Sequence, residues 1–119
     1  MANLTQAQVQ VIITLYNSGK MHEAIDAIKA LSKDHPNVPL LFNIMGACYK
    51  ALSQLNAAVE MFEKAIKIKP DYAEAHYNFG VTLHELGQFD SAIIAYKKAI
   101  ILVPNYPDAH NNLGIIYLD

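Results

Sequence analysis

The chain has 119 residues, 53% of them hydrophobic, which is enough for the core of one compact unit or of about three to four stacked repeats. Its nine basic residues are all lysines, and eleven acidic residues outweigh them to a formal net charge of −2. Because binding to phosphate backbones depends on dense positive patches and on the arginine fork, we expect no nucleic-acid partner.

The sequence also lacks the features of a membrane or exported protein. No apolar run approaches the ~20 residues that cross a bilayer, and the first eight residues show no basic segment followed by an apolar stretch. The single cysteine, Cys48, excludes an intramolecular disulfide and suits a reducing compartment. We therefore predict a soluble, cytoplasmic protein with no membrane partner.

One 34-residue pattern runs along the chain. Residues 5–38 form a degenerate first copy, in which Ile12 stands where later copies have glycine. Residues 39–72 and 73–106 are complete copies, and residues 107–119 supply only the first half. The positions that recur at this interval are Gly46, Gly80 and Gly114; Pro36, Pro70 and Pro104; Ala58 and Ala92; Ala65 and Ala99; Phe62 and Tyr96; and Ile66 and Ile100.

Each copy has the pattern of two helices. In the third copy, apolar residues at steps of three and four predict a first helix that begins near Tyr72, with a capping box formed by Asp71 and Glu74. Gly87 is expected to end that helix in a left-handed conformation, and Pro104 to end the second helix.

The small residues predict where the helices touch. Gly80 and Ala92 are expected where two antiparallel helices approach most closely, and Ala99 where the next pair presses in. Helix formers are plentiful and long alternating β-branched runs are missing. Because one helix pair cannot bury its apolar face alone, the copies must stack. We predict a single all-α domain over residues 1–119.

The third copy resembles the tetratricopeptide repeat, and the resemblance covers essentially the whole chain, closely from residue 39 onward and loosely before it. This resemblance implies a bacterial-type array, which is a right-handed superhelical stack of antiparallel helix hairpins with about 3.5 repeats and seven helices. It also implies a concave groove, lined by the first helices, that binds a peptide or protein segment. The residues that carry the resemblance are the runs Ala73–Leu83, Gly87–Ala92 and Tyr96–Ile100, followed by Pro104.

The same resemblance assigns the groove to outward positions of each first helix. Asn78 and Asn112, with Asn43 close by, are similar to the asparagine ladder in the repeat regions of O-linked N-acetylglucosamine transferases. Amide side chains both donate and accept hydrogen bonds, so they can hold the backbone of an extended peptide. Solvated surface asparagines are the alternative. The predicted groove residues are Gln10, Asn43, Ile44, Ala47, Lys50, Glu74, Tyr77, Asn78, Val81, His84, Asn111 and Asn112.

One subgroup of the family clamps the C-terminal carboxylate of heat-shock chaperones with lysine, arginine and asparagine. None of the five matching positions in this chain carries a positive charge, which disfavours chaperone-tail binding. These positions hold Val9, Ile13, Ile44, Glu74 and Asn78.

No group of residues indicates a reaction centre. Among the five histidines, His76 and His110 are equivalent positions, and no two histidines lie three or four residues apart as metal ligands on a helix would. Cys48 has no neighbouring base and is interpreted as a buried packing thiol. We therefore expect no metal, no cofactor and no catalytic residue, and the chain is not predicted to be an enzyme.

Two apolar features predict contacts with other chains. Ile94 and Ile101 lie on the outer side of their helix, and the last helix has no following helix to cover it. A homo-oligomer formed through this open C-terminal edge is one hypothesis, and a longer array is another. A further alternative is a substrate-presenting arm of a larger sulfotransferase or glycosyltransferase. The residues of the open edge are Leu113, Ile116, Tyr117 and Leu118.

Overall fold

The computed structural model describes residues 3–118, so residues 1, 2 and 119 of the predicted domain lie outside the described residues. Residues 3–118 form seven α-helices and no strand. The helices are α1 (Gln6–Asn17), α2 (Met21–Asp34), α3 (Pro39–Ala51), α4 (Leu55–Ile68), α5 (Ala73–Glu85), α6 (Phe89–Leu102) and α7 (Pro107–Leu118).

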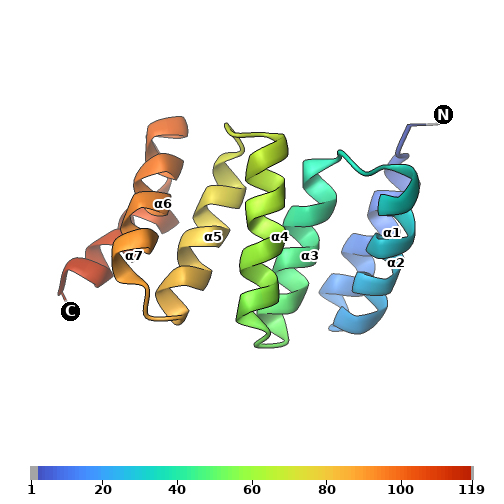
Figure 1. The fold of residues 1–119 in the computed structure, drawn as a ribbon, viewed down its shortest axis with the longest axis horizontal. Coiled ribbons are helices and arrows are strands. Elements are labelled where there is room, and N and C mark those ends of the chain that lie inside the picture. The colour runs from blue at the N-terminus through green and yellow to red at the C-terminus, as the bar shows by residue number, and fades with distance from the viewer. Residues whose placement is uncertain (1–2, 119) are drawn as a thin grey trace.

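The helices form an elongated stack of 46 × 26 × 21 Å, with the two ends of the chain at opposite ends of the stack (Figure 1). Each helix packs against its neighbours in sequence. The helix α5 also contacts both α3 and α7, so these three helices form one layer, and α4 and α6 cover its other side. The predicted all-α stack of seven helices is confirmed.

Gly46 of α3 and Gly80 of α5 are the points where the two helices of a pair meet. A Cβ atom on Gly46 would lie 2.6 Å from Cε1 of Phe62, and one on Gly80 would lie 2.8 Å from Cδ1 of Tyr96. Both rings are fully buried. The aromatic ring of the second helix therefore lies directly on the bare backbone of the first, at the close approach predicted for Gly80.

The first helix pair fills the same place differently. Ile12 of α1 stands at the glycine position and Ile28 of α2 at the ring position, and both are fully buried in one cluster. In the first pair each helix therefore contributes one bulky side chain to the contact, whereas in the later pairs the second helix alone contributes the ring. The degenerate copy keeps the helix contact although it has lost the glycine.

One kind of turn joins the helices within each pair. Gly19, Ser53 and Gly87 have φ angles of +76°, +59° and +77°. In the last of these turns the Gly87 N–H donates to the His84 carbonyl, and the following N–H donates to the Leu83 carbonyl, a Schellman arrangement that the other two turns share. The left-handed Gly87 is confirmed. Ser53 takes the same conformation at a cost of about 1 kcal/mol relative to glycine.

The predicted capping box at Asp71 and Glu74 is wrong. Tyr72 is the N-cap of α5, and no side chain caps this helix. The entering loop is held instead by His76, whose Nε2 lies 2.8 Å from the Pro70 carbonyl oxygen. Because a carbonyl only accepts, Nε2 is the protonated nitrogen. The equivalent contact recurs one period later, between His110 Nε2 and the Pro104 carbonyl at 2.9 Å.

A true capping box lies at the start of α1, where the sequence analysis did not place one. The Thr5 hydroxyl accepts from the Gln8 N–H at 3.1 Å, and the Gln8 side chain accepts from the Thr5 N–H at 2.8 Å. These two bonds satisfy donors that the first turn of a helix leaves free.

The open edge formed by α7 is less exposed than predicted. Ile116 is only 7% exposed and belongs to a cluster with Leu83 and Tyr96, and Leu113 packs partly against the same cluster. The prediction that these two residues are uncovered is wrong, because α7 turns them toward α5 and α6. Tyr117 and Leu118 are exposed as expected.

Gly80 and Gly114 lie in different environments, which predict different effects for the same substitution. Gly80→Leu places a side chain against the buried ring of Tyr96 and should lower the free energy of unfolding by about 1–3 kcal/mol or more. Gly114→Leu is the matched control, because a Cβ there meets no described atom within 4 Å. Thermal and urea denaturation followed by circular dichroism measures both variants. Equal destabilisation of the two would contradict the ring-on-glycine contact.

Candidate functional site

The layer formed by α1, α3 and α5 carries a hollow surface with two adjoining depressions. The first has a volume of about 210 Å³ and the second about 190 Å³. Tyr16, Ala47 and Asn78 line both depressions, so the two are continuous. We call this surface the central groove. Its remaining lining residues are Ile13, Asn43, Ile44, Lys50, Ala51, Phe62, Glu74, Tyr77 and Val81.

A third depression of about 510 Å³ lies where the N-terminal ends of α5 and α7 come together. We call it the tyrosine pocket, because Tyr72, Tyr77 and Tyr106 line it. Glu74 and Asn78 line both this pocket and the central groove, which places the two side by side. Its other lining residues are Lys69, Asp71, Ala73, Val103 and Asp108.

The three predicted ladder asparagines are bonded within the protein. Asn43 is only 3% exposed; its amide donates to the Tyr72 hydroxyl at 3.3 Å and its oxygen accepts from the Asn78 amide at 3.0 Å. The Asn112 amide donates to the Tyr77 hydroxyl at 3.1 Å. The prediction that Asn43 is free to hold a ligand is therefore wrong, because its side chain is buried and bonded to Tyr72 and Asn78.

These bonds fix two of the three rings of the tyrosine pocket. Asn43 of α3 holds Tyr72, which precedes α5, and Asn112 of α7 holds Tyr77 of α5. The ring of Tyr106 stacks on Tyr77 with centroids 5.1 Å apart and planes 26° apart. The pocket wall is thus set by hydrogen bonds and stacking before any ligand arrives.

The carboxylates around this pocket affect the tyrosines beside them. Burial raises the pKa of Tyr106 to about 12, and the charges of Glu74 and Asp108 add to the increase. Burial and then Glu74 also raise the pKa of Tyr72. Both hydroxyls therefore stay protonated at neutral pH.

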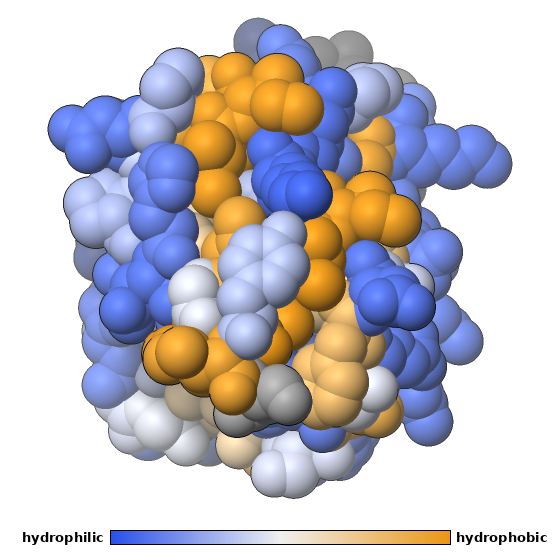
Figure 2. All heavy atoms as spheres, turned by 90° about the vertical axis from the view of Figure 1, so that its left-hand side faces the viewer, coloured by the Kyte–Doolittle hydropathy of each residue, from blue (hydrophilic) through white to orange (hydrophobic). Residues whose placement is uncertain are grey.

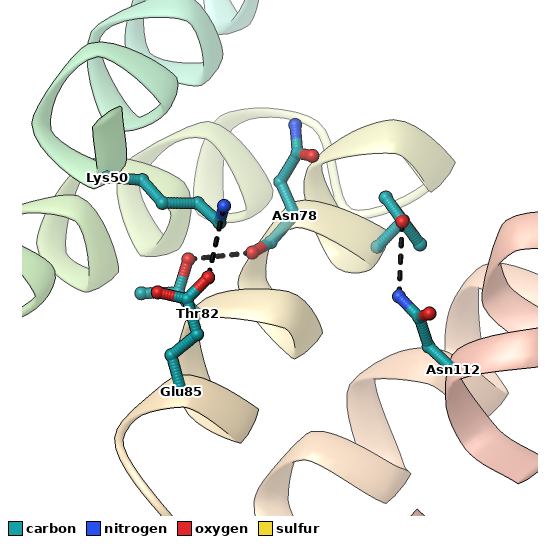
Figure 3. Close-up of polar contacts among 6 residues, drawn as sticks. Lys50, Asn78, Thr82, Glu85 and Asn112 are labelled. Carbon is teal, nitrogen blue, oxygen red and sulfur yellow. Dashed lines mark hydrogen bonds and ion pairs between the residues drawn. The ribbon is translucent and has the colours of Figure 1, made fainter. Parts of the chain in front are cut away.

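A salt bridge spans the other end of the central groove. Lys50 of α3 lies 3.1 Å from Glu85 of α5, with both side chains partly exposed (Figure 3). Exposed pairs of this kind contribute about 0–1 kcal/mol. Figure 3 also shows the Thr82 hydroxyl, which donates to the Asn78 carbonyl at 2.8 Å within α5, and Asn112 reaching from α7 toward the neighbouring helix.

The repeats of this chain match a known protein family. The family model described as "TPR repeat" matches residues 46–87 and 82–119, which together are more than half of the chain. The chain belongs to the tetratricopeptide repeat (TPR) family. The recognition made from residues 73–106 is therefore confirmed.

Curated relatives of this TPR chain include peroxisomal targeting signal receptors of two yeasts. The receptor of Candida glabrata is 27% identical over 82 residues, which cover 67% of this chain and 14% of the receptor. The receptor of Candida albicans is 29% identical over 75 residues, or 63% of this chain and 13% of the receptor. The chain therefore matches about a seventh of the length of these relatives.

Solved TPR structures share the fold closely. The crystal structure of MamA superposes with a TM-score of 0.87 at 25% identity, covering 92% of this chain and 64% of that one. The first TPR of Spaghetti (RPAP3), bound to the HSP90 peptide SRMEEVD, gives a TM-score of 0.91 at 23% identity, covering 94% and 89%. At these identities the second comparison supports the fold alone.

Eight of the twelve predicted groove residues line the central groove, and four lie elsewhere. One of these four, Asn112, bonds to Tyr77 and lines none of the depressions described above. His84 packs edge-on against Phe89, with ring centroids 5.6 Å apart. Gln10 bonds to Thr14 and lines a further hollow at the N-terminal end of the stack, which shares Ile13 with the central groove. Asn111 is exposed on α7 and lines none of the groove depressions described above.

Three tyrosines that line the depressions, Tyr16, Tyr72 and Tyr106, are not among the groove residues predicted from the sequence. Tyr72 and Tyr106 precede α5 and α7 at the 34-residue interval, so the period itself signals that they are equivalent. Tyr16 carries no such signal, because the matching position of the third helix holds Lys50.

The candidate reactive groups all have structural surroundings. Within residues 3–118 no three His, Cys, Asp or Glu side chains gather as a metal site would require. Cys48 is fully buried in the cluster of α1, α2 and α3. No helix among the described residues is both long enough and apolar enough to cross a membrane.

The apolar residues predicted on the outer surface are exposed. Ile94 is 70% exposed, Ile101 is 71% exposed and Leu118 is 88% exposed. Figure 2 looks onto the end of the stack where α6 and α7 lie, and it shows hydrophobic side chains gathered between polar margins.

The buried environment of Cys48 predicts that its thiol reacts slowly with thiol reagents. Burial raises the pKa of this thiol to about 11, so the reactive thiolate is scarce at pH 8 and increases only as the pH approaches 11. Ellman's reagent should modify the native chain far more slowly than the chain unfolded in guanidinium chloride. Equal rates in the two states at pH 8 would show that the thiol is not buried.

Proposed function

We propose that this TPR chain is an interaction scaffold that holds an extended segment of a partner protein in the central groove. The observation that supports this function is the continuity of the two depressions across α1, α3 and α5, with Ala47 shared between them. A small side chain at the centre leaves room for a peptide backbone, while Ile13, Ile44 and Val81 offer apolar contacts along its path.

Polar groups in the groove suit a peptide backbone. The Asn78 amide is bonded to Asn43, but no described residue donates to the Asn78 side-chain oxygen. An oxygen at the edge of a groove can accept from a backbone N–H of a bound segment. The groove thus offers apolar contact and hydrogen bonding without demanding one particular sequence.

The comparisons are in accord with this role. The curated relatives are, by name, receptors of a targeting signal, and TPR repeats are generally non-catalytic interaction modules. The partner itself, a cytoplasmic location and the alternative of an arm attached to a transferase stay predictions. The buried thiol of Cys48 is compatible with a reducing compartment.

Blocking the groove tests the function. A random linear peptide library is selected on the chain, and affinities of the selected peptides are measured by fluorescence anisotropy. Ala47→Gln fills the shared centre of the groove and should weaken binding at least about tenfold, because it removes the room for the peptide. Ala30→Gln, at an exposed position of α2, is the matched control.

Two results would contradict the groove. One is a library that yields no binder, and the other is equal affinity for both variants while circular dichroism shows unchanged helicity.

We also infer self-association as a second candidate function, because α6 and α7 expose Ile94, Ile101, Tyr117 and Leu118. Apolar side chains on one end of a soluble stack are typical of contact surfaces.

Light scattering tests this candidate. The mass of the wild-type chain should rise with concentration, and Ile101→Glu combined with Leu118→Glu should restore the monomer mass. Val11→Glu, at an exposed apolar position of α1, is the control. A wild-type chain that stays monomeric at millimolar concentration would exclude self-association.

A further inference from the structure

We propose that the tyrosine pocket is a subsite for a positively charged lysine or arginine side chain of the bound segment. This inference rests on the proposed function and names the chemistry of the ligand. It is carried by the tyrosine rings, the unpaired carboxylates and the position of the pocket beside the central groove.

Three aromatic rings supply the first element of the subsite. Tyr72, Tyr77 and Tyr106 line one depression of about 510 Å³, and the last two stack on each other. The face of an aromatic ring attracts a cation that lies within about 6 Å of its centre. The pocket already holds one such contact within the chain, because the Lys69 ammonium lies 5.3 Å from the centroid of Tyr72.

The carboxylates supply the second element. Asp71, Glu74 and Asp108 line the pocket, and no described lysine or histidine lies within 4.0 Å of their oxygens. Lys69 is the only basic residue in the lining. The lining therefore carries an excess of two negative charges, which equals the net charge of −2 of the whole chain. The charged residues outside this pocket therefore sum to zero formal charge.

An organic cation fits these residues better than a metal ion. The described residues contain no set of three metal-ligating side chains close enough to hold an ion. Rings with carboxylates at their edge favour a group that combines an apolar surface with a positive charge, as the side chains of lysine and arginine do. An acidic ligand is disfavoured by the same charges.

The pocket is placed to act together with the groove. Glu74 and Asn78 line both, and Tyr77 lines the pocket and one of the groove depressions. A segment extended along α3 and α5 would thus carry a side chain directly into the pocket. The bonds from Asn43 and Asn112 hold two of the rings in place, which lowers the ordering cost of binding.

Three synthetic nonapeptides test the subsite. They share one Gly/Ser sequence and carry arginine, norleucine or glutamate at the central position. Amide shifts are followed by ¹H–¹⁵N NMR during titration. The arginine peptide should shift the amides of Tyr106 and Asp108, and it should bind at least about fivefold more tightly than the other two. Its affinity should fall as salt is raised.

Variants assign the effect to the pocket. Glu74→Gln with Asp108→Asn should reduce binding of the arginine peptide about 5- to 20-fold. Glu60→Gln with Asp90→Asn makes the same change of charge at exposed positions of α4 and α6 and should leave binding unchanged. Circular dichroism and melting temperature confirm that both double variants fold.

The outcomes separate the subsite from the groove. Equal binding of the arginine and norleucine peptides, or equal effects of the two double variants, would overturn the cation subsite. If peptides still bind and Ala47→Gln still weakens them, the groove stands without it. If the arginine peptide shifts Tyr106 and Asp108 while Ala47→Gln changes no affinity, the subsite stands and the groove fails.

Discussion

The contact of a buried ring with a bare glycine backbone is the constraint on which the stack depends. Phe62 on Gly46 and Tyr96 on Gly80 bring the two helices of a pair closer than any side chain at the glycine would permit. This spacing lets α3 and α5 touch each other as well as their own partners. The groove exists because those inner helices lie side by side, so the glycines determine the site without lining it.

The asparagines show how packing and recognition share one set of residues. Asn43 is nearly inaccessible, and it joins α3 to α5 through Asn78 and to the entering loop through Tyr72. Asn112 joins α7 to Tyr77 of α5. A buried amide without partners is costly, whereas a satisfied one fixes the relative position of the elements it joins. These amides therefore stabilise the curved surface and orient the tyrosines upon it.

The sequence was sufficient for the repeat architecture because periodicity reports packing directly. A residue that recurs every 34 positions meets the same neighbours in each copy, as Gly46 and Gly80 do. Local polar contacts were predicted less well, since they depend on the path of a loop. Asp71 failed as a cap because α5 begins one residue later than a capping box at Asp71 requires, with Tyr72 at the N-cap position. Asn43 failed as a free ligand group because it is buried and bonded to Tyr72 and Asn78. Neither the residue at which a helix begins nor the contacts of one buried side chain can be read from the 34-residue period.

The tyrosine pocket differs from the other positions of the array in its rings and in its charge, and the 34-residue period does not account for this difference. The equivalent positions Val38, Tyr72 and Tyr106 show that the ring is absent from the earlier copy, so the tyrosine pocket forms only where two aromatic copies adjoin. Asp71, Glu74 and Asp108 line that same pocket, in which Lys69 is the one basic lining residue, and the charges outside the pocket sum to zero. Uniform helix packing does not require this asymmetry, and carboxylates left unpaired beside one another raise the free energy of the unliganded chain. An array of nearly identical units thus acquires one chemically distinct position, and that position lies beside the groove.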